Sequence, residues 1–354
     1  MIPLAEVLRR HGPAYLRRFG AKLLPSHRDA VRSILQCRTP ALGGQVYRCD
    51  CGRVQFSYHS CNHRACPRCG HADATAWLAR QRQKLLPVPY DLVTFTVPAH
   101  LRALIRSHQK LLYSALLRES AHAVQDVARA HKNLGAEIGL LAVLQTWARD
   151  LHYHPHVHCV VPAGGLSANG LRWVRPKDPH YFLPQAALAM RLRTRFKARV
   201  QRELPQAFAA IPATVWRMDW VADVQPVGSG EPALKYLAGY VYRTAFSAER
   251  IVADDGHTIT FLYRDRKTGA MLPRRLPAQR FLHRFLQHVL PRGFQRVRSF
   301  GWLAPAAKAR WERIQALLDW KAPALLLPDP TPPPLCPHCQ KPMVLVGPLA
   351  RAPP

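Results

Sequence analysis

The chain has 354 residues, and its 51 Lys and Arg against 21 Asp and Glu give a formal net charge of +30. This length allows two or three domains. The basic excess is spread along the whole chain and predicts a polyanionic partner, with nucleic acid favoured over an acidic membrane surface. The sequence has no apolar run of about 18 residues, which argues against a membrane span, and its N-terminus lacks the pattern of a signal peptide. We therefore expect a cytoplasmic, nucleoid-associated protein whose nine cysteines bind metal rather than form disulfides.

The first 86 residues are predicted to form a helical, zinc-binding domain that contacts DNA. A basic helical segment covers residues 1–35, and a helical connector covers residues 72–86. Between them lie two short hooks, Cys49-Asp50-Cys51-Gly52 and Cys66-Pro67-Arg68-Cys69-Gly70. The hooks resemble a zinc ribbon, in which two tight turns present four thiolates to one structural zinc. The first hook departs from that pattern, because one residue separates its cysteines instead of two.

The remaining cysteines and histidines of this segment leave the number of zinc sites open. A second site could be completed, or bystander roles filled, by Cys37, Cys61, His63 and His71. The predicted Zn²⁺ ligands are Cys37, Cys49, Cys51, Cys61, His63, Cys66 and Cys69. Buried thiols without metal are disfavoured, because the segment has few large apolar residues to bury them.

Residues 87–250 are predicted to form the central domain. Alternating and β-branched runs predict strands at 91–97, 138–147, 153–161 and 216–224. Apolar residues at helical spacing predict helices at 101–132, 185–208 and 232–246. The helix at 185–208 is very basic, which makes it a candidate surface for holding DNA, as is the zinc-binding segment.

Residues 251–321 are predicted to be a DNA-binding extension. A strand at 258–263 and a turn at 267–269 predict a hairpin, whose Arg-rich part at 264–275 is a further candidate surface for holding DNA, and helices are predicted at 278–290 and 307–320. From residue 322 the chain is dense in proline, which predicts a linker or a disordered tail. That tail carries Cys336-Pro337-His338-Cys339, which is half of a zinc site. It could take further ligands from the N-terminal domain or from another subunit, or stay empty.

The strand predicted at 153–161 carries alternating histidines. Successive side chains of a strand point to opposite faces, so His154, His156 and His158 are expected on one face. The other face would hold Val157, Cys159 and Val161 for packing on a core. Neutral imidazole is a common metal ligand, so the strand predicts a metal site, with a His-rich surface strand as the alternative.

The helix predicted at 232–246 carries Tyr236 and Tyr240, four residues apart and therefore on one face, with Arg243 beside them. Tyrosine can act as a covalent nucleophile, although its pKa of about 10 means that it needs an electrophile polarised by a metal or by cations. Ala233, Leu237 and Val241 are expected to form a separate apolar stripe for packing. Two core aromatics at helical spacing are the alternative interpretation of the tyrosines.

Three features occur in a fixed order, namely the cysteine-rich N-terminus, His156-Val157-His158 and Tyr236-x-x-x-Tyr240. Together they resemble the rolling-circle insertion-sequence transposases, which are two-tyrosine enzymes of the HUH nuclease superfamily with an N-terminal zinc domain. The resemblance covers roughly residues 5–310. It implies an α+β fold, in which helices flank an antiparallel sheet with the histidine pair on a central strand. It also implies single-stranded DNA at transposon ends and target as the partner.

Carried over to this chain, the resemblance makes His156 and His158 ligands of a catalytic Mg²⁺ or Mn²⁺. The third ligand varies in the superfamily, and Gln145 is the candidate because it lies on the preceding strand and its amide oxygen suits a hard cation. Its rivals are Asp150, His154 and His152.

In the implied mechanism, Tyr236 or Tyr240 attacks phosphorus, a 5′-phosphotyrosine forms and a 3′-hydroxyl leaves. Lys235 and Arg243 could stabilise the charge of the transition state. Base stacking is conceivable for Trp173, Tyr181 and Trp216, although core packing is the favoured interpretation of these aromatics.

Two alternatives remain from the sequence. A plasmid rolling-circle replication initiator or relaxase would use the same chemistry in another biological role. A non-catalytic, zinc-containing nucleic-acid-binding protein would instead use the tyrosines as core residues.

Overall fold

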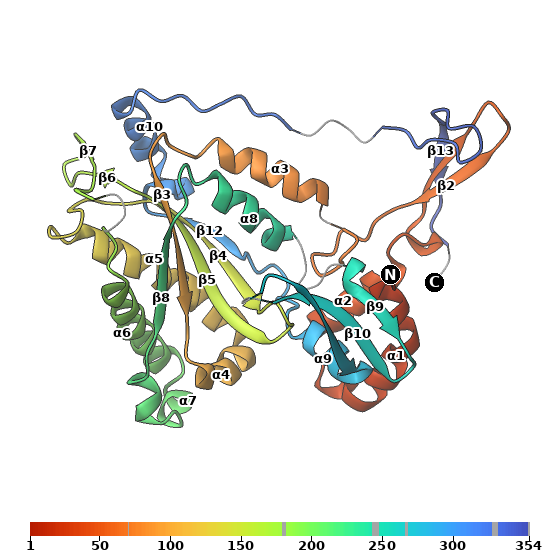
Figure 1. Cartoon of the computed structure of the whole chain (residues 1–354), viewed down its shortest axis with the longest axis horizontal. Helices are drawn as coiled ribbons and strands as arrows, with labels where there is room; N and C mark the ends of the chain where they lie inside the picture. Colours follow the sequence, from red (N-terminus) through yellow and green to blue (C-terminus); the bar gives the residue numbers. More distant parts are fainter. Residues whose placement is uncertain (70, 179–181, 243–247, 266–267, 328–331, 353–354) are drawn as a thin grey trace.

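The computed structural model describes residues 1–354 except 70, 179–181, 243–247, 266–267, 328–331 and 353–354. Its centre is a five-stranded antiparallel sheet (Figure 1), which confirms the predicted α+β class. In spatial order the strands are β12 (Val297–Phe300), β4 (Leu140–Trp147), β5 (Tyr153–Pro162), β3 (Tyr90–Thr96) and β8 (Val221–Pro226). The strand that carries the histidines is therefore the middle one, as expected.

Two strands of this sheet differ from the prediction. β8 begins at Val221 rather than at Trp216, because Trp216 ends a 3-10 turn and stacks on Phe208 and Trp220 in the core. Aromatic and β-branched composition alone does not separate such a turn from a strand. β12 was not predicted, because it has only four residues and acquires its place by pairing with β4.

One face of the sheet is covered by four helices (Figure 1), α4 (Arg102–Ser107), α5 (Gln109–Arg129), α6 (Gln185–Glu203) and α7 (Pro205–Ala209). Val157, Cys159 and Val161 of β5 are buried in this core, as their alternation predicts. The helices predicted at 101–132 and 185–208 are each interrupted. The first breaks at His108, and the second at Leu204, where the following proline disfavours helical backbone.

The opposite face of the sheet is covered by α3 (His71–Arg82) and α8 (Glu231–Tyr242), which pack side by side (Figure 1). Leu141 and Val160 of the sheet share a core with Leu234 and Leu237 of α8. α10 (Lys308–Leu317) packs into the same core through Ile314. A short ribbon of β6 (Gly165–Leu166) and β7 (Trp173–Val174) lies beside it.

A second body combines the N-terminal helices with elements from residues 251–286. Its elements are α1 (Leu4–Phe19), α2 (Pro25–Gln36), β9 (Ile251–Asp254), β10 (Thr258–Arg264), β11 (Met271–Pro277) and α9 (Ala278–Leu286). The predicted hairpin is confirmed as β10 and β11, and β9 adds a third strand to it. Leu8, Ile34, Phe261 and Phe281 share its core, so the N-terminal helices pack on the hairpin.

The C-terminal tail is more ordered than the sequence suggested. Residues 321–327 and 332–334 have no regular secondary structure, as expected for a linker. However, β13 (Val344–Leu349) pairs with β1 (Gly44–Arg48), which in turn pairs with β2 (Val54–Tyr58). The prediction of a disordered tail is wrong there, because the apolar run at 344–346 is completed as a strand by a partner far away in sequence. Among the helices described, none has the length and apolarity needed to span a bilayer.

Candidate active site and cysteine clusters

The register of the sheet brings Gln145 and the two central histidines together. Gln145 of β4 lies opposite His156 of β5, and Thr94 of β3 lies opposite His158. All four residues share the sheet face that α8 covers, and Gln145, His156 and His158 are buried. The strand pair is thus apolar where it supports α8 and polar toward the end that carries Gln145.

Hydrogen bonds orient the side chains of this cluster. His158 Nε2 lies 3.2 Å from Gln145 Oε1, while Gln145 Nε2 donates to the Trp147 carbonyl over 3.0 Å. The second bond holds the amide oxygen toward His158. His156 Nδ1 lies 2.7 Å from the His154 carbonyl, which can only accept, so Nδ1 carries the proton and Nε2 keeps its lone pair.

Burial keeps both imidazoles neutral near pH 7. It lowers the pKa of His158 to about 4. Burial and the neighbouring His158 lower the pKa of His156 well below its ordinary value. His158 Nδ1 lies 3.0 Å from the Thr94 hydroxyl, so with its proton on Nδ1 this imidazole would present the Nε2 lone pair beside the Gln145 amide oxygen. Two neutral imidazoles and an amide oxygen then form a donor set that fits a divalent cation, so the residues present are compatible with the catalytic metal that the resemblance implied.

The rivals of Gln145 have other partners. Asp150 accepts hydrogen bonds from His152 Nδ1 over 2.6 Å and from the Arg274 guanidinium. His154 Nδ1 accepts from Arg102 over 2.8 Å. Among the residues considered for the third ligand, Gln145 is the one with its oxygen against the histidine pair.

The tyrosine helix lies directly over this cluster. The ring of Tyr236 stands edge-to-face on His158, with 5.8 Å between centroids and an angle of 89°. Tyr236 is 43% exposed, which is too open for the core-aromatic alternative. The predicted packing stripe is confirmed, because Ala233 and Leu237 are buried and Val241 packs against the same core.

The other predicted catalytic residues are Lys235, Tyr240 and Arg243, and none of them has a described contact with the histidine cluster. Lys235 Nζ pairs with Glu231 over 3.0 Å and is exposed. Tyr240 lies one turn beyond Tyr236 on α8, and its side chain is outside the described residues. Arg243 is also outside the described residues.

Eight of the described cysteines form two clusters, within each of which all Sγ atoms lie within 4.8 Å of one another. The first cysteine cluster consists of Cys37, Cys61, Cys66 and Cys69. The second cysteine cluster consists of Cys49, Cys51, Cys336 and Cys339.

This arrangement corrects the predicted pairing of the hooks around one zinc. The Cys49 hook sits between β1 and β2, which project away from the Cys66 hook (Figure 1). Cys37, at the end of α2, lies with its Sγ 3.5 Å from that of Cys69 and so helps to complete the first cluster. His63 stands outside both clusters, and its Nδ1 accepts from the Ala65 N–H over 3.1 Å.

Comparison with known proteins shows similarity to transposases. Residues 139–310 match the family model described as a putative transposase, and residues 7–97 match the model of a transposase zinc-binding domain. The chain is 35% identical to the putative transposase y4qJ of Sinorhizobium fredii over 319 residues, which are 85% of this chain and 80% of the relative. It is 29% identical to the transposase for insertion sequence element IS801 of Pseudomonas savastanoi pv. phaseolicola over 301 residues, 78% of this chain and 70% of the relative.

The chain belongs to the IS91/IS801 family of transposases. The family assignment implies DNA as the substrate, and the match to a zinc-binding domain supports structural Zn²⁺ at the N-terminal cysteines of this transposase. No solved structure matches it.

The basic surfaces of the transposase are not all near the histidines. α6 packs with α5 on the opposite face of the sheet. Arg195 pairs there with Asp126 over 2.7 Å, and Arg199 pairs with the buried Glu119 over 2.8 Å. Part of the charge of α6 therefore attaches the helix to α5. Cations near the histidine strand include Arg102, which contacts His154, and Arg274, which pairs with Asp150 just before the strand. The sequence did not single out either arginine.

The stacking candidates mostly serve the core of the transposase. Trp216 is buried, and Trp173 packs against Trp302 with 5.9 Å between ring centroids. Both observations agree with the favoured core interpretation. Tyr181 is outside the described residues.

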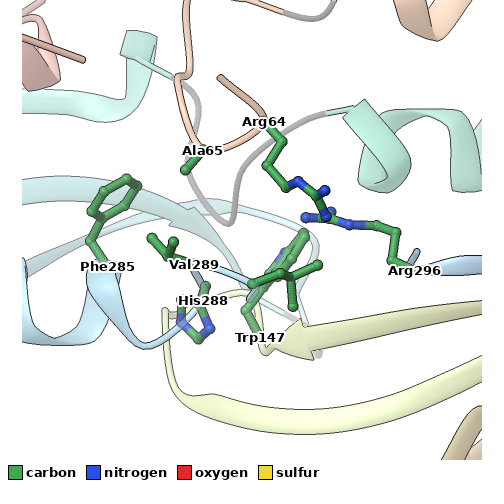
Figure 2. Close-up of a pocket in the computed structure, with 8 residues that line it drawn as sticks. Arg64, Ala65, Trp147, Phe285, His288, Val289 and Arg296 are labelled. Atoms are coloured by element: carbon green, nitrogen blue, oxygen red, sulfur yellow. The ribbon is translucent and has the colours of Figure 1, made fainter. Parts of the chain in front are cut away.

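A small cavity of about 10 Å³ lies where β4 ends against the first cysteine cluster and α9 (Figure 2). Figure 2 shows the guanidinium groups of Arg64 and Arg296 side by side above Trp147. Burial lowers the pKa of Arg296 to about 10 and that of His288 to about 3. This volume holds about one water molecule, so the cavity is a packing junction and not a substrate pocket.

Proposed function

We propose that this transposase nicks and rejoins single-stranded DNA through a 5′-phosphotyrosine during rolling-circle transposition. The observation that carries the proposal is the contact of Tyr236 with His158, on the face that also holds Gln145 and His156. A nucleophile candidate and a set of metal donors thereby meet at one place. The exposure of Tyr236 supports access by a DNA strand.

Gln145, His156 and His158 would hold the Mg²⁺ or Mn²⁺. When bound, this cation supplies Lewis-acid polarisation of the scissile phosphate and a template for its oxygens. The tyrosine hydroxyl attacks phosphorus, the bond from phosphorus to the 3′-oxygen breaks, and that oxygen takes up a proton. The new phosphodiester on tyrosine conserves the bond energy, so a free 3′-hydroxyl can later attack it and restore the tyrosine.

Tyr236 and Tyr240 would divide the cleavages between them: one tyrosine would cut the first DNA end, and the other would cut the second end or the target. A position four residues further along a helix rises by about 6 Å on the same face. This spacing would let both hydroxyls act at one metal in turn. Arg102 and Arg274 are positively charged and flank the histidine strand, where they could bind the phosphates of the entering strand.

The test is an adduct assay with end-labelled single-stranded oligonucleotides that carry the ends of the element encoding this transposase. With Mn²⁺, we expect a covalent adduct that survives denaturing electrophoresis. A Tyr236→Phe/Tyr240→Phe variant should lose it, whereas Tyr58→Phe, on the distant β2 strand, should retain it.

An adduct that persists in the double variant would refute the assignment of the nucleophiles. An adduct formed equally in excess chelator would refute the metal-dependent chemistry. If the protein cleaved the ends only as double-stranded DNA, the proposal of a single-stranded substrate would be refuted.

A further inference from the structure

We propose that the second cysteine cluster binds a second structural Zn²⁺, which fastens the C-terminal tail to the β1–β2 hairpin. The match to a transposase zinc-binding domain ends at residue 97, so it does not include Cys336 and Cys339. These two cysteines nevertheless meet Cys49 and Cys51, and Cys51 and Cys336 are 285 positions apart.

The sulfur positions fit a tetrahedral zinc site. Cys49 Sγ lies 3.3 Å from Cys339 Sγ, and Cys51 Sγ lies 3.6 Å from Cys336 Sγ. Four thiolates at about 2.3 Å from one zinc are separated by about 3.8 Å from each other. The four cysteines are free, and their convergence on one point is the arrangement that a single ion requires.

Two tight turns present the thiols. In the first, the Gly52 N–H donates to the Cys49 carbonyl over 2.9 Å, and Gly52 has a φ of 85° that favours glycine. In the second, the Gln340 N–H donates to the Cys336 carbonyl over 2.9 Å. Hooks of this kind, one from each of two segments, are how structural zinc sites are usually assembled.

The surrounding module lacks a hydrophobic core of its own. Its buried apolar cluster consists of Cys49, Cys336 and Met343. The strands around it leave large apolar side chains open, with Phe56 52% and Val344 65% exposed. A three-stranded sheet that buries so little apolar surface needs another source of stability, and metal binding is the usual one in small modules.

Zinc at this site would also fix the position of the linker between α10 and the second cysteine cluster. The first residues of the linker, from 321 to 327, follow α10 and pass the end of α3, where Gln83, directly after that helix, donates to the Pro323 carbonyl over 3.2 Å. Zinc in the second cluster would hold the far end of this linker. The tail would then be attached at two places, at Pro323 by the hydrogen bond from Gln83 and at Cys336 and Cys339 by zinc.

Zinc stoichiometry tests the site directly. We expect two Zn²⁺ per purified wild-type chain and one per chain of a Cys336→Ser/Cys339→Ser variant, measured by elemental analysis. Cys159→Ala removes a buried cysteine outside both clusters and should keep two. One zinc in the wild-type chain, or two in the double serine variant, would overturn the proposal, as would disulfides among these four cysteines detected by mass spectrometry.

A cut in the linker tests the fastening. A protease site replacing the exposed Leu325–Leu327 allows the tail to be severed in the folded protein. The severed tail should remain with the rest of the protein in gel filtration, and the double serine variant should release it. Retention in that variant would show that the pairing of β13 with β1 suffices and would refute the role of zinc. Neither measurement depends on DNA cleavage, so failure of the proposed nuclease function would leave both results interpretable.

Discussion

Gln145→Ala is expected to weaken metal binding at the active site specifically. The substitution removes the oxygen that lies 3.2 Å from His158 Nε2 and the amide that donates to the Trp147 carbonyl. Changes to residues that orient metal ligands cost about 10- to 100-fold in metal affinity, and loss of a ligand should cost at least as much. We expect the Mn²⁺ concentration for half-maximal adduct formation to rise by about 10- to 100-fold, which corresponds to about 1.4–2.7 kcal/mol.

A matched control separates this effect from loss of stability. Gln109→Ala also removes a buried glutamine, which donates to Tyr113 over 3.3 Å on the far side of the sheet. Each variant should lower the free energy of unfolding by about 1–3 kcal/mol through lost or unpaired hydrogen bonds. Only Gln145→Ala should shift the Mn²⁺ titration, and Gln145→His, which restores a metal donor, should reverse most of that shift.

An unchanged Mn²⁺ titration in Gln145→Ala would refute the assignment of Gln145. A shift in Asp150→Asn or His154→Ala of the size predicted for Gln145→Ala would move the third ligand to one of those residues. Asp150 is already bonded to His152 and Arg274, so we expect Asp150→Asn to leave the titration within about threefold of wild type, as for a residue that is not a ligand.

Three further predictions concern other parts of the chain. Burial lowers the pKa of His288 to about 3, so this imidazole takes up a proton near pH 6.5 in the unfolded chain but stays neutral in the folded chain. Acidification from pH 7 to 5 should therefore lower the free energy of unfolding by about 2 kcal/mol through His288 alone, and the His288→Gln variant should not show this part of the loss. Glu119→Gln should lower the unfolding free energy by about 1–3 kcal/mol by breaking its pairs with α6, whereas the exposed Glu312→Gln control should change it by less than about 0.5 kcal/mol in denaturant titrations. Lys235→Ala should slow adduct formation by at most about fivefold in a time course, because its ammonium is exposed and paired with Glu231. The three arguments would be contradicted, in turn, by a His288→Gln variant whose unfolding free energy depends on pH as in the wild type, by a Glu119→Gln variant of unchanged unfolding free energy, and by a hundredfold slower adduct formation in Lys235→Ala.

The local parts of the active site could be predicted because periodicity encodes which face a side chain occupies. The alternation through His156 and His158 placed them together, and the helical spacing around Tyr236 separated its face from the packing stripe of Leu237. Gln145 followed from its place on the preceding strand, although only the register shows that it lies opposite His156.

The long-range parts were beyond the sequence for a physical reason. Which cysteine hooks meet depends on where distant segments pack, and three similar hooks carry no local signal for their partners. The same holds for β12, whose four residues become a strand only beside β4. Arg102 and Arg274 likewise reach the histidine strand from separate elements, so their positions could not be read from spacing.

The face of β4 and β5 that α8 covers explains how the tyrosine is positioned. Toward Leu141 and Val160 it is apolar and buries Leu237 of α8, while toward Gln145 it carries the polar cluster. Apolar packing therefore sets the position of α8, and α8 sets the position of Tyr236 relative to His158. Contacts within the chain establish this geometry, which keeps the proposed nucleophile beside the proposed metal donors. Preorganisation of this kind would lower the entropy cost of bringing the proposed nucleophile to a phosphate.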